Sequence, residues 1–329
     1  MTTPLVPAPA ATALPSPHGL TRPRRLVPGD RVAVVAPSGP IDAARLAAGC
    51  AILRSWGLEP VVAPHVLDVH PRLDYFAGTD EDRAADFQQA WLDPTIAAVI
   101  CARGGYGAQR VCDLLDWNAL RAAPPKLLVG FSDVTALHEE LAVRLGLASL
   151  YGPMGAAGSF VEDPATSEHL RRTLFDPAGV TTLTGPQAGP LVPGRAHGIT
   201  AGGCLSVLAA ECGTPGARPS YAGTILLLED VNEQPYRIDR ILTQLLRSGA
   251  LDGVSGVALG SWEGCGPADR VRAVMLERLG PLGVPVLWEL GFGHSSSTLT
   301  VPLGVPAILD ADAGTLTMEL PALAGELDH

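Results

Sequence analysis

The 329-residue chain is poor in charge and contains a single lysine, Lys126. Charged residues make up 17% of the sequence, and the net charge at pH 7 is −11. Nucleic acids and anionic membranes attract proteins through clusters of Lys and Arg, and a surplus of acidic residues opposes such attraction. We therefore expect neither nucleic acid nor a membrane surface among the partners of this protein.

Cysteine is scarce, and its spacing fits neither a disulfide framework nor a zinc site. The six cysteines form no C-x-x-C pair, and most of them lie within apolar runs. Buried free thiols are typical of a reducing compartment, and a closed zinc site needs Cys and His at short, regular spacings. The pattern predicts a cytoplasmic protein without disulfides or a metal site, and we expect no cofactor.

Long hydrophobic runs are also missing. No stretch of about 18 uninterrupted apolar residues occurs, so the sequence predicts no membrane-spanning helix. Residues 1–25 are rich in Pro and Ala and lack the continuous apolar segment of a secretory signal. We interpret residues 1–25 as a flexible tail.

The chain does contain short apolar runs that alternate with helical patterns. In the first half these runs lie near residues 31–39, 60–64, 96–107 and 126–133. Strands separated by helices are typical of a parallel sheet that is covered on both faces and has right-handed crossovers. The pattern predicts an α/β fold with an N-terminal, doubly wound domain over residues 26–176.

The second half of the chain does not continue the regular alternation of strands and helices. Residues 177–196 are dense in Gly, Pro and Thr, which predicts a linker between domains. Beyond the linker, strand and helix patterns occur together, and the last segment resembles a β-meander. Residues 197–329 are therefore predicted to form a C-terminal, mixed α/β domain with a β-rich end.

The segment LLVGFSDVTALH, residues 127–138, places Ser132 between an apolar strand and a helix. Ligands of open α/β sheets bind beyond the carboxyl ends of the strands, where helix N–H groups can stabilise an oxyanion. Ser132 is therefore a candidate nucleophile. A serine in front of a helix is far more often an N-cap, and the G-x-S-x-G elbow is incomplete because Val134 replaces its second glycine.

The segment CARGGYGAQR, residues 101–110, follows the preceding strand. Paired glycines let a backbone N–H approach a ligand closely, so this turn is a candidate oxyanion hole. A purely structural turn is the alternative. A dinucleotide fingerprint does not fit, because Arg110 stands where the third glycine is required, and the Gly-Lys-Ser/Thr of a phosphate-binding loop is missing.

A serine nucleophile needs a base, and the base needs an acid that orients it. His294 lies in a Gly- and Ser-rich loop after an apolar strand and is the candidate base. His138 and His169 lie in helical segments, where surface or core roles are commoner. Glu229 directly ends the apolar strand TILLLE, and for that reason we prefer it to the nearby Glu233 as the acid.

Six motifs together resemble one family. They are ARGGYGA (102–108), PKLLVGFSDVTALH (125–138), LYGPM (150–154), AGGCLSVLA (201–209), LLLEDVNEQPYRIDR (226–240) and GFGHSSSTLTVPLG (291–304). In this order they resemble the LD-carboxypeptidase family of serine peptidases, which also contains microcin C immunity proteases. The resemblance covers nearly everything after Arg25, and it implies two domains with the active site between them and a homodimer.

The resemblance also implies roles for individual residues. The Ser-His-Glu triad of the family falls on Ser132, His294 and Glu229. Its oxyanion hole uses the amide after the nucleophile, here that of Asp133, and a glycine of the Gly-Gly turn, here Gly105. The mechanism of the family needs no metal.

Contacts with the substrate are less closely defined. Where family members often have GGNL, this chain has Cys204 in place of the Asn. Arg103 is a candidate partner for a substrate carboxylate, with packing against the sheet edge as the alternative. Trp262 is a candidate pocket wall, with a place in the core as the alternative.

The activity implied by the resemblance is that of a serine carboxypeptidase that hydrolyses an L–D peptide bond. Its substrate would be a small peptide, the muropeptide tetrapeptide, from which terminal D-Ala is released during cell-wall recycling. An immunity peptidase that cleaves microcin-like peptidyl nucleotides is an alternative within the same chemistry. An inactive module that binds peptides or sugars is an alternative of another class.

Overall fold

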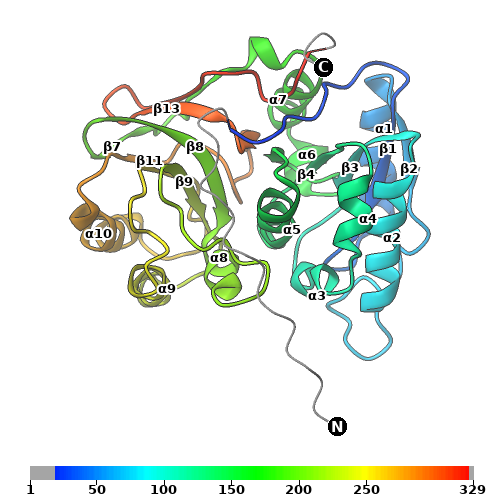
Figure 1. Ribbon diagram of the computed structural model, residues 1–329, viewed down its shortest axis with the longest axis horizontal. Coiled ribbons are helices and arrows are strands. Elements are labelled where there is room, and N and C mark those ends of the chain that lie inside the picture. The colour runs from blue at the N-terminus through cyan, green and yellow to red at the C-terminus, as the bar shows by residue number, and fades with distance from the viewer. Residues whose placement is uncertain (1–18, 326–329) are drawn as a thin grey trace.

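A computed structural model describes residues 19–325 as two lobes, each built on its own sheet (Figure 1). The elements of the first lobe are β1 (Arg31–Val35), α1 (Ala43–Ser55), β2 (Glu59–Val62), α2 (Asp80–Leu92), β3 (Ile96–Cys101), α3 (Ala108–Cys112), α4 (Trp117–Ala122), β4 (Leu127–Gly130), α5 (Thr135–Glu140), β5 (Ser149–Tyr151), α6 (Gly158–Glu162) and α7 (Pro164–Phe175).

The elements of the second half of the chain follow in sequence. They are β6 (Thr182–Leu183), β7 (Gly189–Val192), β8 (Arg195–Cys204), α8 (Leu205–Glu211), β9 (Thr224–Glu229), α9 (Pro235–Arg247), β10 (Gly256–Leu259), α10 (Ala268–Leu279), β11 (Val286–Trp288), β12 (Val301–Leu303), β13 (Pro306–Asp310) and β14 (Thr315–Met318). The predicted α/β class and the two-domain arrangement are confirmed.

The first sheet has the strand order β12-β5-β4-β3-β1-β2, and all its strands except β12 run parallel. Alternate residues of β1 enter opposite faces of this sheet. Val32 and Val34 belong to the core under α1, α6 and α7, whereas Ala33 and Val35 belong to the core under α2 to α5. Helices therefore cover both faces, as the uninterrupted apolar strands predict.

The second sheet has the order β6-β14-β13-β8-β9-β10-β11-β7, with a parallel centre and antiparallel flanks. Helices α8, α9 and α10 cover one face, on which Leu226 and Leu228 lie. The opposite face, with Ile225 and Leu227, shares one hydrophobic cluster with α5 of the first lobe. The two lobes thus have a common core, and α5 and α8 meet at the junction between them (Figure 1).

Two segments occupy places in the sheets that the sequence did not predict. Residues 177–196, predicted as a linker, contain β6 and β7, which form the two edges of the second sheet. Edge strands tolerate Gly and Pro because one side of their backbone makes no ladder hydrogen bonds. Strand β12, from the second half of the chain, pairs antiparallel with β5 and so completes the first sheet.

Only part of the predicted N-terminal tail can be compared with the structure. Residues 1–18 lie outside the described residues. In the rest of the segment, Thr21 forms a β-bridge with Leu147, and Arg24 forms one with Ala324. Residues 19–25 therefore lie against the body of the protein.

The six cysteines are free, and five of them are buried. Among the described helices, none combines the length and the apolar composition that crossing a membrane requires.

Gly49 of α1 packs directly against the backbone that follows β5. A Cβ atom at Gly49 would lie 1.6 Å from the carbonyl oxygen of Gly155. The Gly49→Ala substitution gains about 1 kcal/mol of helix propensity, but overpacking against rigid backbone costs about 1–3 kcal/mol or more. We expect chemical denaturation to show a lower free energy of unfolding. Gly189→Ala, where the added Cβ meets nothing within 4 Å, should change it by less than about 0.5 kcal/mol.

Candidate active site

Ser132 stands at the sharp turn between β4 and α5. Its φ is 63°, a left-handed conformation that few non-glycine residues adopt. The turn is tight because Gly130 has no Cβ, which would lie 2.8 Å from Cγ1 of Val134. Ser132 does not cap the helix through its side chain. Its Oγ instead lies 2.9 Å from Nε2 of His294.

His294 and Glu229 come from the second lobe. Glu229 is the last residue of β9, and its carboxylate is fully buried. Its Oε2 lies 2.6 Å from Nδ1 of His294 and also accepts the backbone N–H of His294 at 3.2 Å. Because an ionised carboxylate only accepts hydrogen bonds, Nδ1 carries the proton and Nε2 is left to accept the Ser132 hydroxyl.

Electrostatics at His294 favour its protonated form. Burial lowers the pKa of the imidazole, but the hydrogen bond to Glu229 and the charges of Glu229 and Asp230 raise it. The net result is a pKa above the usual value for histidine. The imidazole is therefore a stronger base than an exposed histidine, and it lies next to a hydroxyl.

Tyr151 closes a ring of hydrogen bonds around these three residues, and no pattern in the sequence marks it as a site residue. The hydroxyl of Tyr151 accepts the backbone N–H of Ser132 at 3.1 Å and donates to Oε1 of Glu229. Burial, followed by the charge of Glu229, raises the pKa of Tyr151. The phenol therefore stays protonated and keeps its role as a donor. The only signal in the sequence was its place at the end of an apolar strand, within LYGPM.

The carboxylate of Asp133 holds the glycine turn, residues 104–107, in place beside Ser132. It accepts hydrogen bonds from the hydroxyl of Ser38 at 2.6 Å and from the backbone N–H of Ala108 at 2.8 Å. These contacts join the ends of β1, β3 and β4, which meet at one edge of the sheet. Asp133 thus has a structural role for its side chain in addition to the role predicted for its backbone amide.

The glycine turn lies directly against Ser132. A Cβ atom at Gly104 would lie 3.0 Å from Cβ of Ser132 and 3.2 Å from its Oγ. Gly105 follows with a φ of +120°, which favours glycine. Its backbone N–H donates to no described residue. The turn therefore places an available amide group in the neighbourhood of the Ser132 hydroxyl.

Helix α7 of the first lobe holds the loop that carries His294. The backbone N–H of Thr298 donates to the hydroxyl of Thr166, and the N–H of Thr300 donates to Nδ1 of His169. Burial lowers the pKa of His169 to about 4, so its ring is neutral and can accept this bond. Two side chains of the first lobe thus fix the loop of the second lobe that carries His294. From the sequence, only the second lobe was expected to position this base.

Other candidates lie away from the Ser132–His294–Glu229 group. Glu233 pairs with Arg237 on α9 rather than with His294. His138 is buried and bonds to Ser149 and to the carbonyl of Gly130, which supports the strands beneath Ser132. Burial lowers the pKa of His138 to about 4.

Among the described residues, one group has the spacing of metal ligands. It consists of His65, Asp68 and Asp82, and it is separate from the residues that surround Ser132.

Two pockets flank the site. Arg103 and Gly105 line one of about 430 Å³ in the first lobe, together with Gly39 and Tyr75. This pocket lies at the carboxyl ends of β1 and β3, where the strand order of the sheet reverses and ligands of such folds bind. The guanidinium of Arg103 donates to the carbonyl of Pro40 at 2.6 Å.

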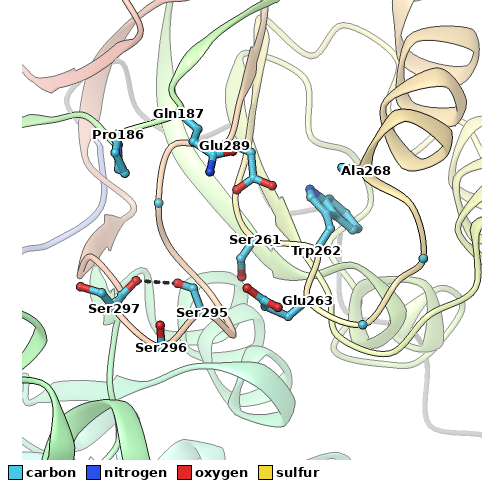
Figure 2. Close-up of a pocket in the computed structure, with 13 residues that line it drawn as sticks. Pro186, Gln187, Ser261, Trp262, Glu263, Ala268, Glu289, Ser295, Ser296 and Ser297 are labelled. Carbon is cyan, nitrogen blue, oxygen red and sulfur yellow. Dashed lines mark hydrogen bonds between the residues drawn. The ribbon is translucent and has the colours of Figure 1, made fainter.

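The other pocket, of about 490 Å³, lies in the second lobe and includes Trp262 (Figure 2). Trp262 is 7% exposed and also belongs to the hydrophobic core beside α9 and α10. Trp262 therefore packs in the core and also lines this pocket, and its contact with a substrate stays a prediction.

The sequence matches two profiles that together span most of the chain. Residues 32–152 match the LD-carboxypeptidase N-terminal domain, and residues 197–309 match the LD-carboxypeptidase C-terminal domain. The chain belongs to the LD-carboxypeptidase family. This confirms the resemblance seen in the motifs. LD-carboxypeptidases are serine peptidases, so the chain is assigned to the hydrolases.

Individual LD-carboxypeptidase relatives match over almost their whole lengths. A Streptomyces coelicolor protein that is provisionally named a carboxypeptidase is 63% identical over 304 residues, which are 92% of this chain and 98% of that protein. The murein tetrapeptide carboxypeptidase of Pseudomonas aeruginosa is 35% identical over 294 residues, 86% of this chain and 94% of that protein.

A solved structure of the microcin C7 self-immunity protein MccF, in the wild-type apo state, shares the LD-carboxypeptidase fold. It has a TM-score of 0.82 and 25% identity, and the match covers 92% of this chain and 99% of that one.

Removing the hydroxyl of Tyr151 should weaken the folded state. The Tyr151→Phe substitution leaves the N–H of Ser132 and one oxygen of the buried Glu229 without their partner. An unsatisfied buried polar group costs about 1–3 kcal/mol, so we expect the free energy of unfolding to fall by about that amount. Tyr236→Phe, at a residue that is 61% exposed, serves as the control. Equal denaturation midpoints for the two variants would show that the ring of hydrogen bonds contributes nothing to stability.

Proposed function

We propose that the protein is a serine carboxypeptidase that hydrolyses the L–D peptide bond before the terminal D-Ala of a muropeptide tetrapeptide. The observation that carries this proposal is the continuous hydrogen-bonded sequence Ser132–His294–Glu229, with distances of 2.9 and 2.6 Å. A hydroxyl, a base and an orienting acid in this order form an activated nucleophile for acyl transfer.

In this mechanism, His294 removes the proton of Ser132 as its oxygen attacks the scissile carbonyl carbon. Glu229 holds the imidazole in the required tautomer and stabilises the imidazolium that forms. His294 then gives its proton to the amine of the leaving amino acid. Water, deprotonated by His294, attacks the acyl-enzyme and releases the shortened peptide. These steps use only side chains of this protein, water and the substrate.

The amides of Gly105 and Asp133 are proposed to stabilise the tetrahedral oxyanion. The support is the position of the glycine turn against Ser132, the available N–H of Gly105 and the helical turn that begins at Ser132. Removing one such donor typically costs about 10²–10³ in turnover. Arg103, in the same pocket as Gly105, is proposed to bind the terminal carboxylate of the substrate.

A muropeptide is the substrate class that we favour, since the relative of Pseudomonas aeruginosa at 35% identity is named a murein tetrapeptide carboxypeptidase. Cleavage of a peptidyl nucleotide is the second candidate, supported by the likeness to the self-immunity protein MccF. A module that binds without catalysis has no support, because all three reactive side chains are present. A role in cell-wall recycling, a cytoplasmic location and a homodimer remain predictions from the sequence.

Incubation with a muramoyl tetrapeptide, followed by mass spectrometry, tests the proposed activity. We expect the wild-type protein to release one alanine and Ser132→Ala to lose at least about 10⁴-fold in kcat/KM. Ser55→Ala, at the exposed end of α1, is the control and should cleave normally. A peptidyl nucleotide assayed in parallel distinguishes the second candidate. Cleavage of neither substrate, or unchanged cleavage by Ser132→Ala, contradicts the proposal.

The pH dependence of kcat/KM tests the pair formed by His294 and Glu229. Only the neutral imidazole can accept a proton, so activity should fall as the pH drops through the raised pKa of His294. We expect the midpoint of this acidic limb to lie above about 6.5, the ordinary value. Glu229→Gln removes the two largest interactions that raise the pKa of His294 and leaves only the charge of Asp230, so the limb should move to lower pH while the rate falls about 10⁴-fold. An acidic limb that stays in place in Glu229→Gln assigns it to another group.

A further inference from the structure

Two half-exposed tyrosines line the pocket of the first lobe that contains Arg103 and Gly105. Tyr75 and Tyr106, which we call the tyrosine pair, are each 49% exposed. Their ring centroids lie 6.3 Å apart, and the ring planes are inclined by 37°. Aromatic side chains that remain exposed together beside a cavity are typical of a surface that binds an apolar group of a ligand.

The tyrosine pair packs on a rigid base. Phe76 is fully buried, and its ring centroid lies 4.4 Å from that of Tyr75 and 5.4 Å from that of Tyr106. The guanidinium groups of Arg83 and Arg110 lie over the ring of Phe76, at 4.8 and 4.7 Å from its centroid. Packing therefore orders the two tyrosine rings before a ligand arrives, which lowers the entropic cost of binding.

The backbone around the tyrosine pair is fixed to the glycine turn. The N–H of Gly39 donates to the carbonyl of Gly104 at 3.0 Å, and the N–H of Ala77 donates to the carbonyl of Ser38 at 2.9 Å. A Cβ atom at Gly39 would lie 3.0 Å from the carbonyl oxygen of Gly104 and 3.5 Å from that of Tyr75. The loop after β1, the loop that contains Tyr75 and the glycine turn therefore meet at Gly39, next to the proposed oxyanion hole.

Arg103 supplies a positive charge in the same pocket. Its guanidinium donates to the carbonyl of Pro40 and pairs with no carboxylate of the described residues. The proposed function assigns it to the terminal carboxylate of the substrate. In the last residue of a peptide, the carboxylate and the side chain are attached to the same carbon atom. A pocket that holds the carboxylate through Arg103 therefore also receives the side chain of the leaving residue.

The size of the pocket exceeds what the methyl group of alanine requires. Its volume of about 430 Å³ lies within the range of about 300–1,000 Å³ that is typical of pockets for small organic molecules. A methyl group would leave most of this space, and the faces of the tyrosine pair, in contact with water. A larger apolar side chain would displace that water and cover the rings.

We propose that this pocket accepts an aromatic or long apolar side chain on the leaving residue, so that the protein also releases D-amino acids larger than alanine. The side chain packs on the tyrosine pair while Arg103 binds the carboxylate of the same residue. The chemistry is unchanged, since the peptide C–N bond breaks and the leaving amine takes its proton from His294. The inference rests on the proposed carboxypeptidase function and extends the range of residues that it removes.

Three tetrapeptides that differ only in their last residue test the proposal. That residue is D-alanine, D-methionine or D-phenylalanine, and mass spectrometry follows the shortened peptide, which is the same product in all three assays. For the wild-type protein we expect kcat/KM for the two larger residues to be at least as high as for D-alanine. The reason is that their side chains bury apolar surface on the tyrosine pair.

Substitutions of the tyrosine pair test whether its rings make this contact. Tyr106→Ala should lower kcat/KM for the D-phenylalanine peptide about tenfold more than for the D-alanine peptide, and Tyr75→Ala should act in the same direction. Tyr106→Phe keeps the ring and should retain the wild-type ratio. Tyr236→Ala, at an exposed tyrosine of α9, is the control and should also retain it.

The outcomes separate this inference from the proposed function. A lower kcat/KM of the wild-type protein for the D-phenylalanine peptide than for the D-alanine peptide overturns the inference and leaves the carboxypeptidase function intact. An equal loss on both peptides in Tyr106→Ala does the same. Cleavage of none of the three peptides by the wild-type protein overturns both.

Discussion

The contact between Ser132 and His294 is the interaction on which the rest of the structure depends. Its two partners come from different sheets, so an acyl-transfer site exists only if the lobes are held at a fixed separation. A shift of about 1 Å would lengthen the 2.9 Å hydrogen bond beyond its useful range. Much of the architecture can be understood as a means of preventing that shift.

Three features hold the lobes together. Strand β12 leaves the second half of the chain and completes the first sheet next to β5, whose last residue is Tyr151. The inner face of the second sheet shares a hydrophobic cluster with α5, the helix that follows Ser132. Side chains of α7 bind the backbone of the loop that carries His294. The lobes are thus joined by a strand, a common core and a set of polar contacts.

The burial of the Glu229 carboxylate explains why Tyr151 and His294 both form hydrogen bonds to it. Removing an ionised group from water is expensive unless its oxygens are satisfied. Glu229 accepts from the hydroxyl of Tyr151 and from both the ring and the backbone N–H of His294. Because Tyr151 also binds the N–H of Ser132, the same hydrogen bonds that satisfy the acid fix the nucleophile and the base.

The sequence was sufficient to predict the elements that depend on local pattern. The alternation of strand and helix patterns predicted the fold of the first lobe. Polar residues at the ends of apolar strands, together with the family motifs, identified Ser132, Glu229 and His294 as candidate catalytic residues. Such residues stand out because polar groups are rare where a buried strand ends in a loop.

Contacts made over long sequence separations were not predicted. The place of β12 in the first sheet depends on pairing partners about 150 residues apart, which no local pattern encodes. Tyr151 resembles any aromatic residue at the end of a strand, and its role follows only from three-dimensional proximity to Glu229.

A double-mutant cycle on kcat/KM for a muramoyl tetrapeptide tests the central claim most directly, because groups that act as one unit have strongly non-additive effects. If Ser132 and His294 work together across the two lobes, Ser132→Ala, His294→Ala and the double variant should all be impaired to about the same extent. Losses that multiply, so that the double variant is far slower than either single variant, would show that the two residues act independently and would contradict the account.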